Sequence, residues 1–378
     1  MYRATHDEPG TPDAWRRGLR ILPTILGIVA ALDLSIALNA QNGSASPRAE
    51  LRPAPLAELP GQVDSNSPAV WDMVGGRNLL FVMTSMSGQP RRAWGRDLTS
   101  LGAAREVSLT APDGGVWMEA ILQDADGTWY GYYHNEIPAT MCRTTAKVLP
   151  RIGAARSRDR GATWELLGVI LEAPPRTYDC MTENAYFVGG VGDFSVQLDA
   201  ESQDVYFFHS LYLRSPSAQG VGVARLAWAD RDDPGGKIMI WRNDAWLPAT
   251  PFGRDEQRWI YPSASPIFPA SDSWHDDDNT VDAFWGPSVH WNTYLSRYVM
   301  LLARASDGNY RTEGIYISYA PSLDSPTQWS APVKILSGGA WYPQVIGVES
   351  GSGTDKIAGE WARFYMMGTS QHLLHLIR

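Results

Sequence analysis

The stretch VWMEAILQDADGTWYGYYHNE, residues 116–136, predicts two short strands joined by a turn. Aromatic and β-branched residues, which strands prefer, are frequent in residues 116–123 and 127–136. The Asp and Gly residues of the intervening DADG are typical of tight turns. The pair therefore predicts a β-hairpin.

The same pair recurs five times along the chain. Its first members are residues 67–73, 116–123, 192–199, 286–292 and 341–347. Its second members are residues 77–85, 127–136, 204–212, 297–305 and 362–370. The first four pairs continue into third and fourth candidate strands at 91–98 and 105–110, 152–157 and 164–171, 221–229 and 237–241, and 314–320 and 333–336.

Four strands per unit, with no helical periodicity between units, predict an all-β chain folded as a five-bladed β-propeller with four-stranded blades. The 35 Gly and 26 Pro residues agree with many tight turns. Because the fifth unit is short, we expect a strand near residues 57–63 to close the ring.

The first forty residues are typical of an export signal. An arginine pair, Arg16 and Arg17, precedes a largely apolar stretch at 21–40, in which Ala37 and Ala40 are candidate cleavage positions. The pair also permits a twin-arginine signal. We therefore expect an exported protein, periplasmic or extracellular.

A retained N-terminal anchor is the alternative, although Asp33 interrupts the apolar stretch and favours cleavage. Residues 41–60 are rich in Pro, Ala and Ser and lack periodicity, as expected of a linker. The propeller is then residues 61–378. We expect no stable membrane partner unless the N-terminal segment is retained.

The amino-acid composition limits which classes of partner the protein can bind. The formal net charge of −9 argues against a nucleic-acid partner, because phosphate binding needs a basic surface. Sixteen Trp and sixteen Tyr residues fit either sugar stacking or buried strand aromatics. In an exported protein a bridge between Cys142 and Cys180 is chemically permitted, but spacing does not decide it. No zinc-binding motif is present in the sequence.

SRDRGATWE, residues 157–165, has the S-x-D-x-G-x-T-W spacing called an Asp box. It falls between the third and fourth strands of the second unit, and SLDSPTQWS, residues 322–330, is a looser copy at the same place in the fourth. We expect Asp159 to accept backbone N–H bonds within its turn, Gly161 to adopt a positive φ and Trp164 to pack between strands. The turn then has a structural role.

The candidate chemistry lies on the first strand of each unit, because the innermost strands of a propeller converge on its axis. Three consecutive units present an acid there: Asp64, Glu119 and Asp193. A buried carboxylate costs free energy unless it is paired or used, which favours a functional site. The alternative is that these acids cap inner-strand N–H groups or bind a structural cation.

The pattern resembles the five-bladed glycoside hydrolases of the arabinanase, β-xylosidase and invertase group. VDSNSPAVW, residues 63–71, matches the first-blade element of that group best, and the resemblance covers residues 61–378 as a blade pattern. The second-blade acid is usually Asp where this chain has Glu119, and the third is usually Glu where it has Asp193. Roles are therefore not transferred blade for blade.

Hydrolysis of a glycosidic bond needs one protonated acid at the leaving oxygen and one ionised carboxylate on the opposite face. We assign Asp64 as base or nucleophile, Glu119 as general acid and Asp193 as the group that separates their pKa values. Glu136 is the reserve acid. The expected activity is hydrolysis of a plant or bacterial cell-wall polysaccharide or oligosaccharide, with arabinan-like furanosides favoured by the resemblance.

Ten residues are candidates for substrate binding through stacking or hydrogen bonds. They are Trp71, Trp117, His134, Glu136, His209, Trp285, His290, Trp341, Tyr342 and Gln344. No cofactor is expected. HDDDN, residues 275–279, is either a structural calcium site or a solvated acidic loop.

Two other functions stay open. A sialidase also carries Asp boxes, but it needs six blades and an arginine cluster for the substrate carboxylate. A non-catalytic propeller that binds glycan through an aromatic face is the second alternative. A tight pocket with converging acids favours the enzyme, whereas a broad flat aromatic face favours the binder.

Overall fold

The computed structural model describes residues 46–378 apart from 110, 112, 254, 273 and 276–280. The first blade contains β2 (Ala69–Val74), β3 (Arg77–Met86), β4 (Gln89–Gly95) and β5 (Arg105–Glu106). The second contains β6 (Gly115–Gln123), β7 (Trp129–Pro138), β8 (Val148–Ser157) and β9 (Glu165–Leu171). The third contains β10 (Val191–Leu198), β11 (Asp204–Leu211), β12 (Gly220–Ala227), β13 (Met239–Arg242) and β14 (Ala245–Pro248).

The fourth blade contains β17 (Ala283–Asn292), β18 (Arg297–Ala305), β19 (Thr312–Ala320) and β20 (Val333–Ser337), with β22 (Ile357–Ala358) parallel to β17. The fifth contains β21 (Gln344–Gly347), β23 (Trp361–Met366), β24 (Thr369–Ile377) and β1 (Arg48–Glu58). A separate hairpin joins β15 (Thr250–Phe252) and β16 (Asp255–Ile260).

The helical segments of the described residues are single 3₁₀ turns. They are η1 (Thr140–Cys142), η2 (Pro175–Thr177), η3 (Pro216–Ala218), η4 (Trp228–Asp230) and η5 (Pro326–Gln328). None of the helices in this part of the chain has the length and apolar character needed to span a bilayer.

The first strands of successive blades contact one another in the order β2, β6, β10, β17 and β21. Hydrogen bonds between Ser67 and the Gln344 side chain link the last of these strands to the first. The five sheets therefore follow one another around a common axis, and the predicted five-bladed propeller is confirmed. Four strands per blade was right for the first, second and fifth blades, while the third and fourth sheets have five strands.

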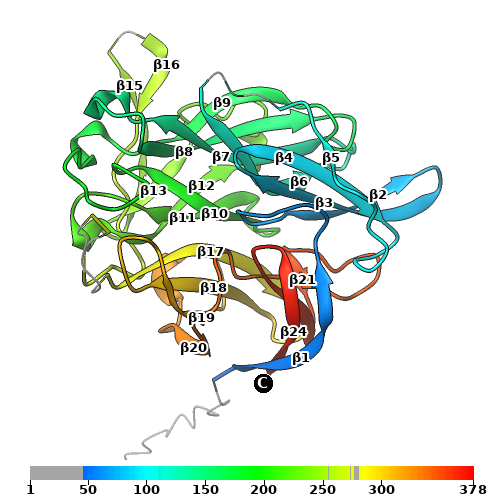
Figure 1. Cartoon of the computed structure of the whole chain (residues 1–378). Helices are drawn as coiled ribbons and strands as arrows, with labels where there is room; N and C mark the ends of the chain where they lie inside the picture. The colour runs from blue at the N-terminus through cyan, green and yellow to red at the C-terminus, as the bar shows by residue number, and fades with distance from the viewer. Residues whose placement is uncertain (1–45, 110, 112, 254, 273, 276–280) are drawn as a thin grey trace, which may run out of the picture. The chain divides into compact units, whose positions relative to one another are not determined.

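An N-terminal strand closes the ring, but it is not the expected one. β1 pairs antiparallel with β24 and forms the outer edge of the fifth blade, where Figure 1 shows it in blue beside β24 in red. The expected linker at 41–60 is therefore wrong over Arg48–Glu58. Pro53 and Pro55 favoured the prediction of a linker, because proline is rare inside sheets. An edge strand such as β1 nevertheless tolerates proline. Residues 1–45, which include the expected signal, lie outside the described residues.

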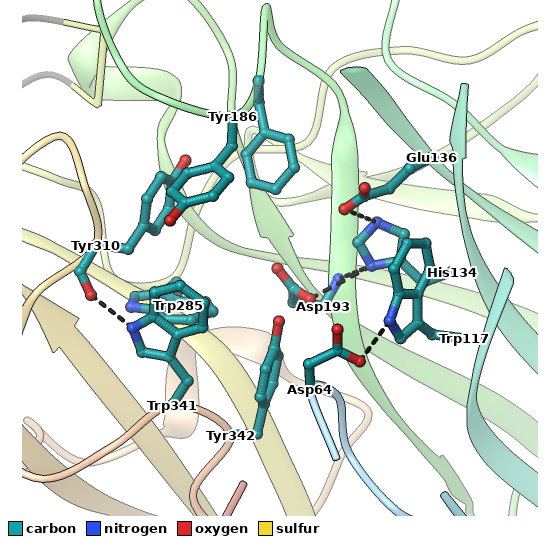
Figure 2. Close-up of a pocket in the computed structure, with 11 residues that line it drawn as sticks. Asp64, Trp117, His134, Glu136, Tyr186, Asp193, Trp285, Tyr310, Trp341 and Tyr342 are labelled. Atoms are coloured by element: carbon teal, nitrogen blue, oxygen red, sulfur yellow. Dashed lines mark hydrogen bonds and ion pairs between the residues drawn. The ribbon is translucent and has the colours of Figure 1, made fainter. Parts of the chain in front are cut away.

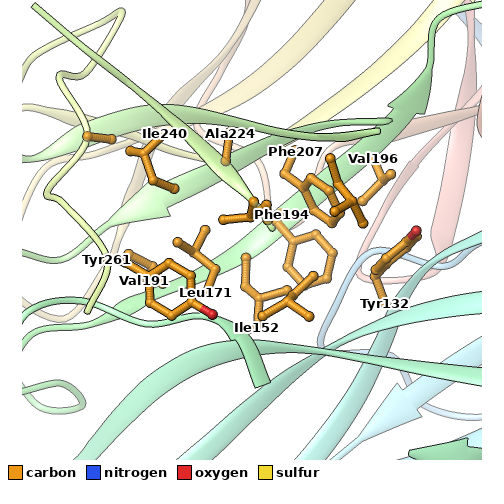
Figure 3. Packing of buried hydrophobic residues seen from close by; sticks show 14 of the residues in the cluster. Tyr132, Ile152, Leu171, Val191, Phe194, Val196, Phe207, Ala224, Ile240 and Tyr261 are labelled. Carbon is orange, nitrogen blue, oxygen red and sulfur yellow. The ribbon is translucent and has the colours of Figure 1, made fainter. Parts of the chain in front are cut away.

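The core lies between the faces of neighbouring blades. Figure 3 shows one such layer, in which Tyr132 and Ile152 of the second blade pack with Phe194 and Phe207 of the third. All four side chains are almost fully buried. Burying an aliphatic or aromatic side chain contributes roughly 1.5–3 kcal/mol. Such layers fix each blade, and with it each inner strand, relative to its neighbours.

The turn at residues 157–164 joins β8 to β9. Asp159 accepts hydrogen bonds from the N–H groups of Ala162 and Thr163 at 3.0 and 2.9 Å and from the Thr163 hydroxyl at 2.8 Å. Gly161 has φ 75°, and the Trp164 indole donates to its carbonyl at 3.1 Å. The Trp164 N–H donates to the Ser108 carbonyl at 2.9 Å, so the turn also ties the second blade to the first.

Cys142 and Cys180 form a disulfide, with their Cα atoms 5.1 Å apart. The sequence left this bridge open. It links the segment after β7 to the loop between the second and third blades. That loop continues to Tyr186 and Phe187, which line the pocket described below.

The ring closure predicts the effect of an N-terminal truncation. A chain that begins at residue 59 loses β1 and leaves the edge of β24 unpaired, so it gives up several backbone hydrogen bonds, each worth about 1 kcal/mol. A chain that begins at residue 46 keeps β1 and is the control. We expect a lower Tm only for the shorter chain, as measured by circular dichroism. Equal Tm values would show that β1 does not stabilise the ring.

The turn at 157–164 gives a second prediction. Asp159→Ala removes at least three hydrogen bonds, so we expect a loss of about 1–3 kcal/mol in unfolding free energy with activity per folded molecule retained. Asp324→Ala is the matched control, because within the described part of the chain the Asp324 carboxylate accepts a single hydrogen bond, from the Ser322 hydroxyl. Urea unfolding of both variants measures the difference. Loss of turnover at unchanged stability would contradict the structural role.

Candidate active site

A pocket of about 180 Å³ lies where the beginnings of the inner strands converge. Its two walls differ in chemistry (Figure 2). The polar wall carries Asp64, His134, Glu136 and Asp193, with Trp117 beside them. The aromatic wall carries Tyr186, Phe187, Trp285, Tyr310, Trp341 and Tyr342. No Lys or Arg is among these described lining residues.

Two of the expected acids occupy β-bulges. The register of β6 against β7 shifts at Glu119, and that of β10 against β11 shifts at Asp193. A bulge bends its strand and redirects a side chain, and bulges are frequent beside active sites. Asp193 also has φ 40°, in the left-handed region that non-glycine residues rarely adopt. Backbone strain of this kind marks a candidate functional position.

Asp64 lies just before β2 and is held in one orientation. One carboxylate oxygen accepts from the Ser87 N–H at 3.0 Å, and the other accepts from the Trp117 indole N–H at 2.6 Å. Burial raises the pKa of Asp64 above its ordinary value, and these two hydrogen bonds offset part of that increase. Both donors point at the carboxylate, so they favour its ionised form.

His134, on β7, lies between three carboxyl groups. Figure 2 shows two of them, those of Glu136 and Asp193. Its Nδ1 is 3.3 Å from an oxygen of Asp193 and 3.5 Å from an oxygen of Glu119. Its Nε2 is 3.5 Å from an oxygen of Glu136. The imidazole therefore connects acids from β6, β7 and β10. We expected His134 to bind substrate hydroxyls, but both ring nitrogens face carboxyl groups.

Glu119 lies behind the pocket wall. Its side chain has 0% exposure, it does not line the pocket, and one of its oxygens accepts from the Phe194 N–H at 2.6 Å. Burial raises the pKa of Glu119 to about 7. A carboxyl group in this position does not reach a bound glycoside, which the expected role of general acid requires.

Glu136 faces the pocket from the end of β7, and its side chain is 23% exposed. Burial raises the pKa of Glu136 to about 7, and the charges of Asp193 and Asp64 raise it further, while His134 lowers it. Glu136 is thus a carboxyl group that is protonated at mildly acidic pH and accessible to a ligand. Glu136, which the sequence analysis named as the reserve acid, therefore reaches the pocket, whereas Glu119 does not.

Asp193 lies at the bottom of the polar wall and is 3% exposed. The Tyr212 hydroxyl donates to its carboxylate, and the Ser210 hydroxyl donates to its backbone carbonyl at 3.1 Å. Its own N–H points at His134 Nδ1 from 3.1 Å. These contacts from β7, from β11 and from Tyr212 just after it hold the bulged conformation in place.

The aromatic wall is assembled mainly from segments outside the strands. Tyr310 and Tyr342 have φ 62° and 55°, and the Trp341 indole donates to the Tyr310 carbonyl at 2.7 Å. Trp285, on β17, packs edge to face against Tyr310, Trp341 and Tyr342. Aromatic faces of this kind are suited to the apolar face of a sugar ring.

The structure brings most of the expected binding residues together. Trp117, His134, Glu136, Trp285, Trp341 and Tyr342 line the pocket. The others do not: these are Trp71, His209, His290 and Gln344.

Each of these four has another environment. The Trp71 indole donates to the Gly353 carbonyl at 2.8 Å and lines a groove between the first and fifth blades. Gln344 bonds the backbone of Ser67. His209 and His290 are fully buried on their strands, and burial lowers the pKa of His209 to about 4 and that of His290 to about 3. The alternation of side chains along a strand does not show which end of the strand faces the pocket. The sequence therefore predicted these four residues at the pocket, although they lie elsewhere.

Sequence reasoning missed three lining residues, Tyr186, Phe187 and Tyr310. All three lie in loops, where no alternation of apolar and polar residues indicates which side chains face the pocket. Of the candidate calcium segment 275–279, only His275 is described. Its Nδ1 lies 2.7 Å from the Thr182 hydroxyl and its Nε2 lies 3.1 Å from the Tyr212 carbonyl. The remaining residues of that segment lie outside the described residues.

No family model and no curated protein matches this chain. Among solved structures it is similar to a thermostable family-43 glycoside hydrolase, with 11% identity, 86% of this chain and 91% of that chain covered, and a TM-score of 0.47. The endo-arabinase of Bacteroides thetaiotaomicron VPI-5482 matches at 11% identity over 85% of this chain and 95% of its own, with a TM-score of 0.47. The arabinanase of Bacillus subtilis matches at 13% identity over 84% and 95%, with a TM-score of 0.43.

These names fall in the group that the blade pattern resembles. At such identities and scores the likeness is one of fold, and function has to rest on the chemistry of the site.

The buried Glu119 predicts a pH dependence of stability. Because its folded-state pKa is raised to about 7 from 4.5, the folded chain holds a proton that the unfolded chain has lost. Its contribution is fully present below about pH 4.5 and is lost as the pH rises through about 7. Glu119→Gln should reduce the stability difference between pH 5 and pH 8.

Urea unfolding at the two pH values measures this effect. Glu201→Gln, at an exposed position, is the control and should leave the difference unchanged. If Glu119→Gln has the same pH dependence as the wild type, the Glu119 carboxyl is not protonated in the folded protein.

Proposed function

We propose that this protein is a glycoside hydrolase that acts on a neutral sugar, with Asp64 as base or nucleophile and Glu136 as general acid. The observation that carries the proposal is the pocket itself: two carboxyl groups in unlike environments face one cavity whose opposite wall is aromatic. Two acids with separated protonation behaviour are what glycosidic hydrolysis requires.

The two roles follow from the contacts of each carboxyl group. Asp64 receives two N–H bonds, which favour a carboxylate able to attack an anomeric carbon or to activate water. Glu136 keeps its proton up to about pH 7 and is accessible, so it can protonate the leaving oxygen. Asp193, in the pocket floor, orients neighbouring groups. Inversion and retention both remain consistent with this assignment.

The charge of the pocket favours a neutral sugar. Its described lining has three carboxyl groups and no Lys or Arg, so the carboxylate of a sialic or uronic acid would meet repulsion from these acids and no Lys or Arg to pair with. Its volume of about 180 Å³ is below the roughly 300–1,000 Å³ of drug-sized ligand sites and suits one sugar unit. A sialidase needs six blades and an arginine cluster, so the five blades and the absence of arginine from the described lining both argue against that alternative.

The resemblance of the blade pattern to the arabinanase group makes arabinan-like furanosides the first substrates to test. Arabinans, xylans, fructans and bacterial wall arabinogalactan form the panel, and sialyllactose represents the rival activity. Product sizing separates release of single sugars from internal cleavage. Binding of glycan without any product would favour the non-catalytic propeller instead.

Two substitutions test the roles. Glu136→Gln should lower turnover of a natural oligosaccharide roughly 10²–10⁴-fold but spare much of the rate on an activated aryl glycoside, whose leaving oxygen needs little protonation. Asp64→Asn should lower turnover of both substrates. Glu172→Gln is the control, because Glu172 is a partly buried carboxyl that does not line this pocket.

The pH profile gives the same assignment a second test. Wild-type kcat/KM should fall as the pH rises through about 7, where Glu136 loses its proton, and Glu136→Gln should remove that limb. Rescue of Asp64→Asn rather than Glu136→Gln by the aryl glycoside would reverse the two roles. Wild-type rates in both variants would reject the site.

A further inference from the structure

His134 has an unusual set of neighbours for a buried histidine. Three carboxyl groups surround it: Glu119 from β6, Asp193 from β10 and Glu136 from its own strand. Asp64 faces the same pocket from the chain before β2. In β8, the strand on its other side, its partner is the apolar Ile152.

The charges of this cluster need a counterion. Glu119 and Asp193 present oxygen atoms within 4.8 Å of each other, and both side chains are almost fully buried. Two buried carboxylates this close cannot both stay ionised unless a positive group or a proton compensates them. His134 is the one basic side chain among the described residues that line the pocket, and therefore the one that could carry this positive charge.

The Nδ1 atom of His134 faces one donor and two acceptors. Without a proton, Nδ1 accepts the Asp193 N–H at 3.1 Å but leaves the facing oxygens of Glu119 and Asp193 without a donor. With a proton, Nδ1 can donate to the Asp193 carboxylate and to the facing oxygen of Glu119, and it gives up that one neutral bond. Charge-assisted contacts are roughly twice as strong as neutral ones, so the imidazolium is favoured. Burial lowers the pKa of His134, but the bond and charge of Asp193 and the contact with Glu119 raise it well above its ordinary value.

The imidazole ring is also held in one place. A Cβ atom at Gly192 would lie 2.6 Å from the ring carbon Cε1, so only glycine leaves room for it. The Trp117 ring also lies close to the imidazole, with ring centroids 5.6 Å apart. Because β6 and β10 fix these neighbours, Nε2 stays directed at Glu136.

We propose that His134 is a positioning residue, an imidazolium held by Glu119 and Asp193 that orients Glu136 and stabilises the carboxylate formed when Glu136 gives its proton to the leaving oxygen. This rests on the proposed role of Glu136. The proton moves from Glu136 to the departing alcohol, and His134 keeps its own. Glu119 then has a use without touching substrate: one of its oxygens faces His134 Nδ1, and its negative charge, present above about pH 7, helps to keep His134 charged there.

The activity test uses two variants. His134→Gln should lower kcat on a natural oligosaccharide at least tenfold with little change in KM and move the alkaline limb of the pH profile upward, because a positive charge no longer lowers the pKa of Glu136. Gly192→Ala keeps every titratable group and displaces only the ring, so it should shift the limb in the same direction by less. An unmoved limb in both variants would overturn the proposal.

A spectroscopic test does not depend on activity. In protein labelled with ¹⁵N-histidine, the His134 resonances should stay those of an imidazolium from pH 5 to pH 8, and Glu119→Gln should make them titrate within that range. A neutral His134 in the wild type would overturn the proposal. If the wild type cleaves no glycoside, the proposed function fails while this measurement still decides the charge of His134.

A bound metal is the competing explanation, because Glu119, His134 and Asp193 each offer a donor atom to one point. Titration of the purified protein with Mn²⁺ or Zn²⁺ alone, followed by calorimetry, separates the two. Stoichiometric binding that is lost in His134→Gln would overturn the imidazolium in favour of a metal site. Absence of binding would support the ion-paired cluster.

Discussion

Pairing of β1 with β24 is the interaction on which the rest of the propeller depends. The last blade takes three strands from the C-terminus and its outer strand from the N-terminus, so the two ends of the described chain are held in one sheet. Without this pairing the ring has a free edge, and no single blade buries both of its faces alone. The convergence of inner strands, and therefore the pocket, is a property of the closed ring.

Closure brings the inner strands together, but bulges decide which side chains reach the axis. In a regular strand, neighbours alternate between faces, and Glu119 and Asp193 would each keep the orientation set by that alternation. At both positions one residue is left out of the pairing, and the side chain is redirected. The two strands thus place two carboxyl groups beside the same ring nitrogen, Nδ1 of His134.

Much of this could be predicted from the sequence. Strands such as β7, β11 and β18 were foreseen within about two residues, because their aromatic and β-branched runs are bounded by turns. The inner-strand acids followed from the repeat. β1 was missed because its prolines resemble a linker, and its pairing with β24 is a contact between distant residues that no local pattern reports.

The site was harder to predict than the fold for a related reason. The repeat identifies the strand that carries Glu119 but not whether its side chain reaches the pocket. That difference in exposure is what separates Glu119, which is fully buried, from Glu136, which is partly exposed. Tyr186 and Tyr310 come from loops whose conformation depends on tertiary contacts, including the disulfide that ends at Cys180.

The two walls therefore differ in origin as well as in chemistry. The polar wall comes mostly from paired strands, whose positions are fixed by inter-blade packing, so the spacing of its carboxyl groups is insensitive to loop variation. The aromatic wall comes mostly from connections between strands, where Tyr310 and Tyr342 adopt left-handed backbone conformations. Such a division lets one arrangement of acids serve different ligands, since a change in a loop alters what is recognised and leaves the acid–histidine cluster in place.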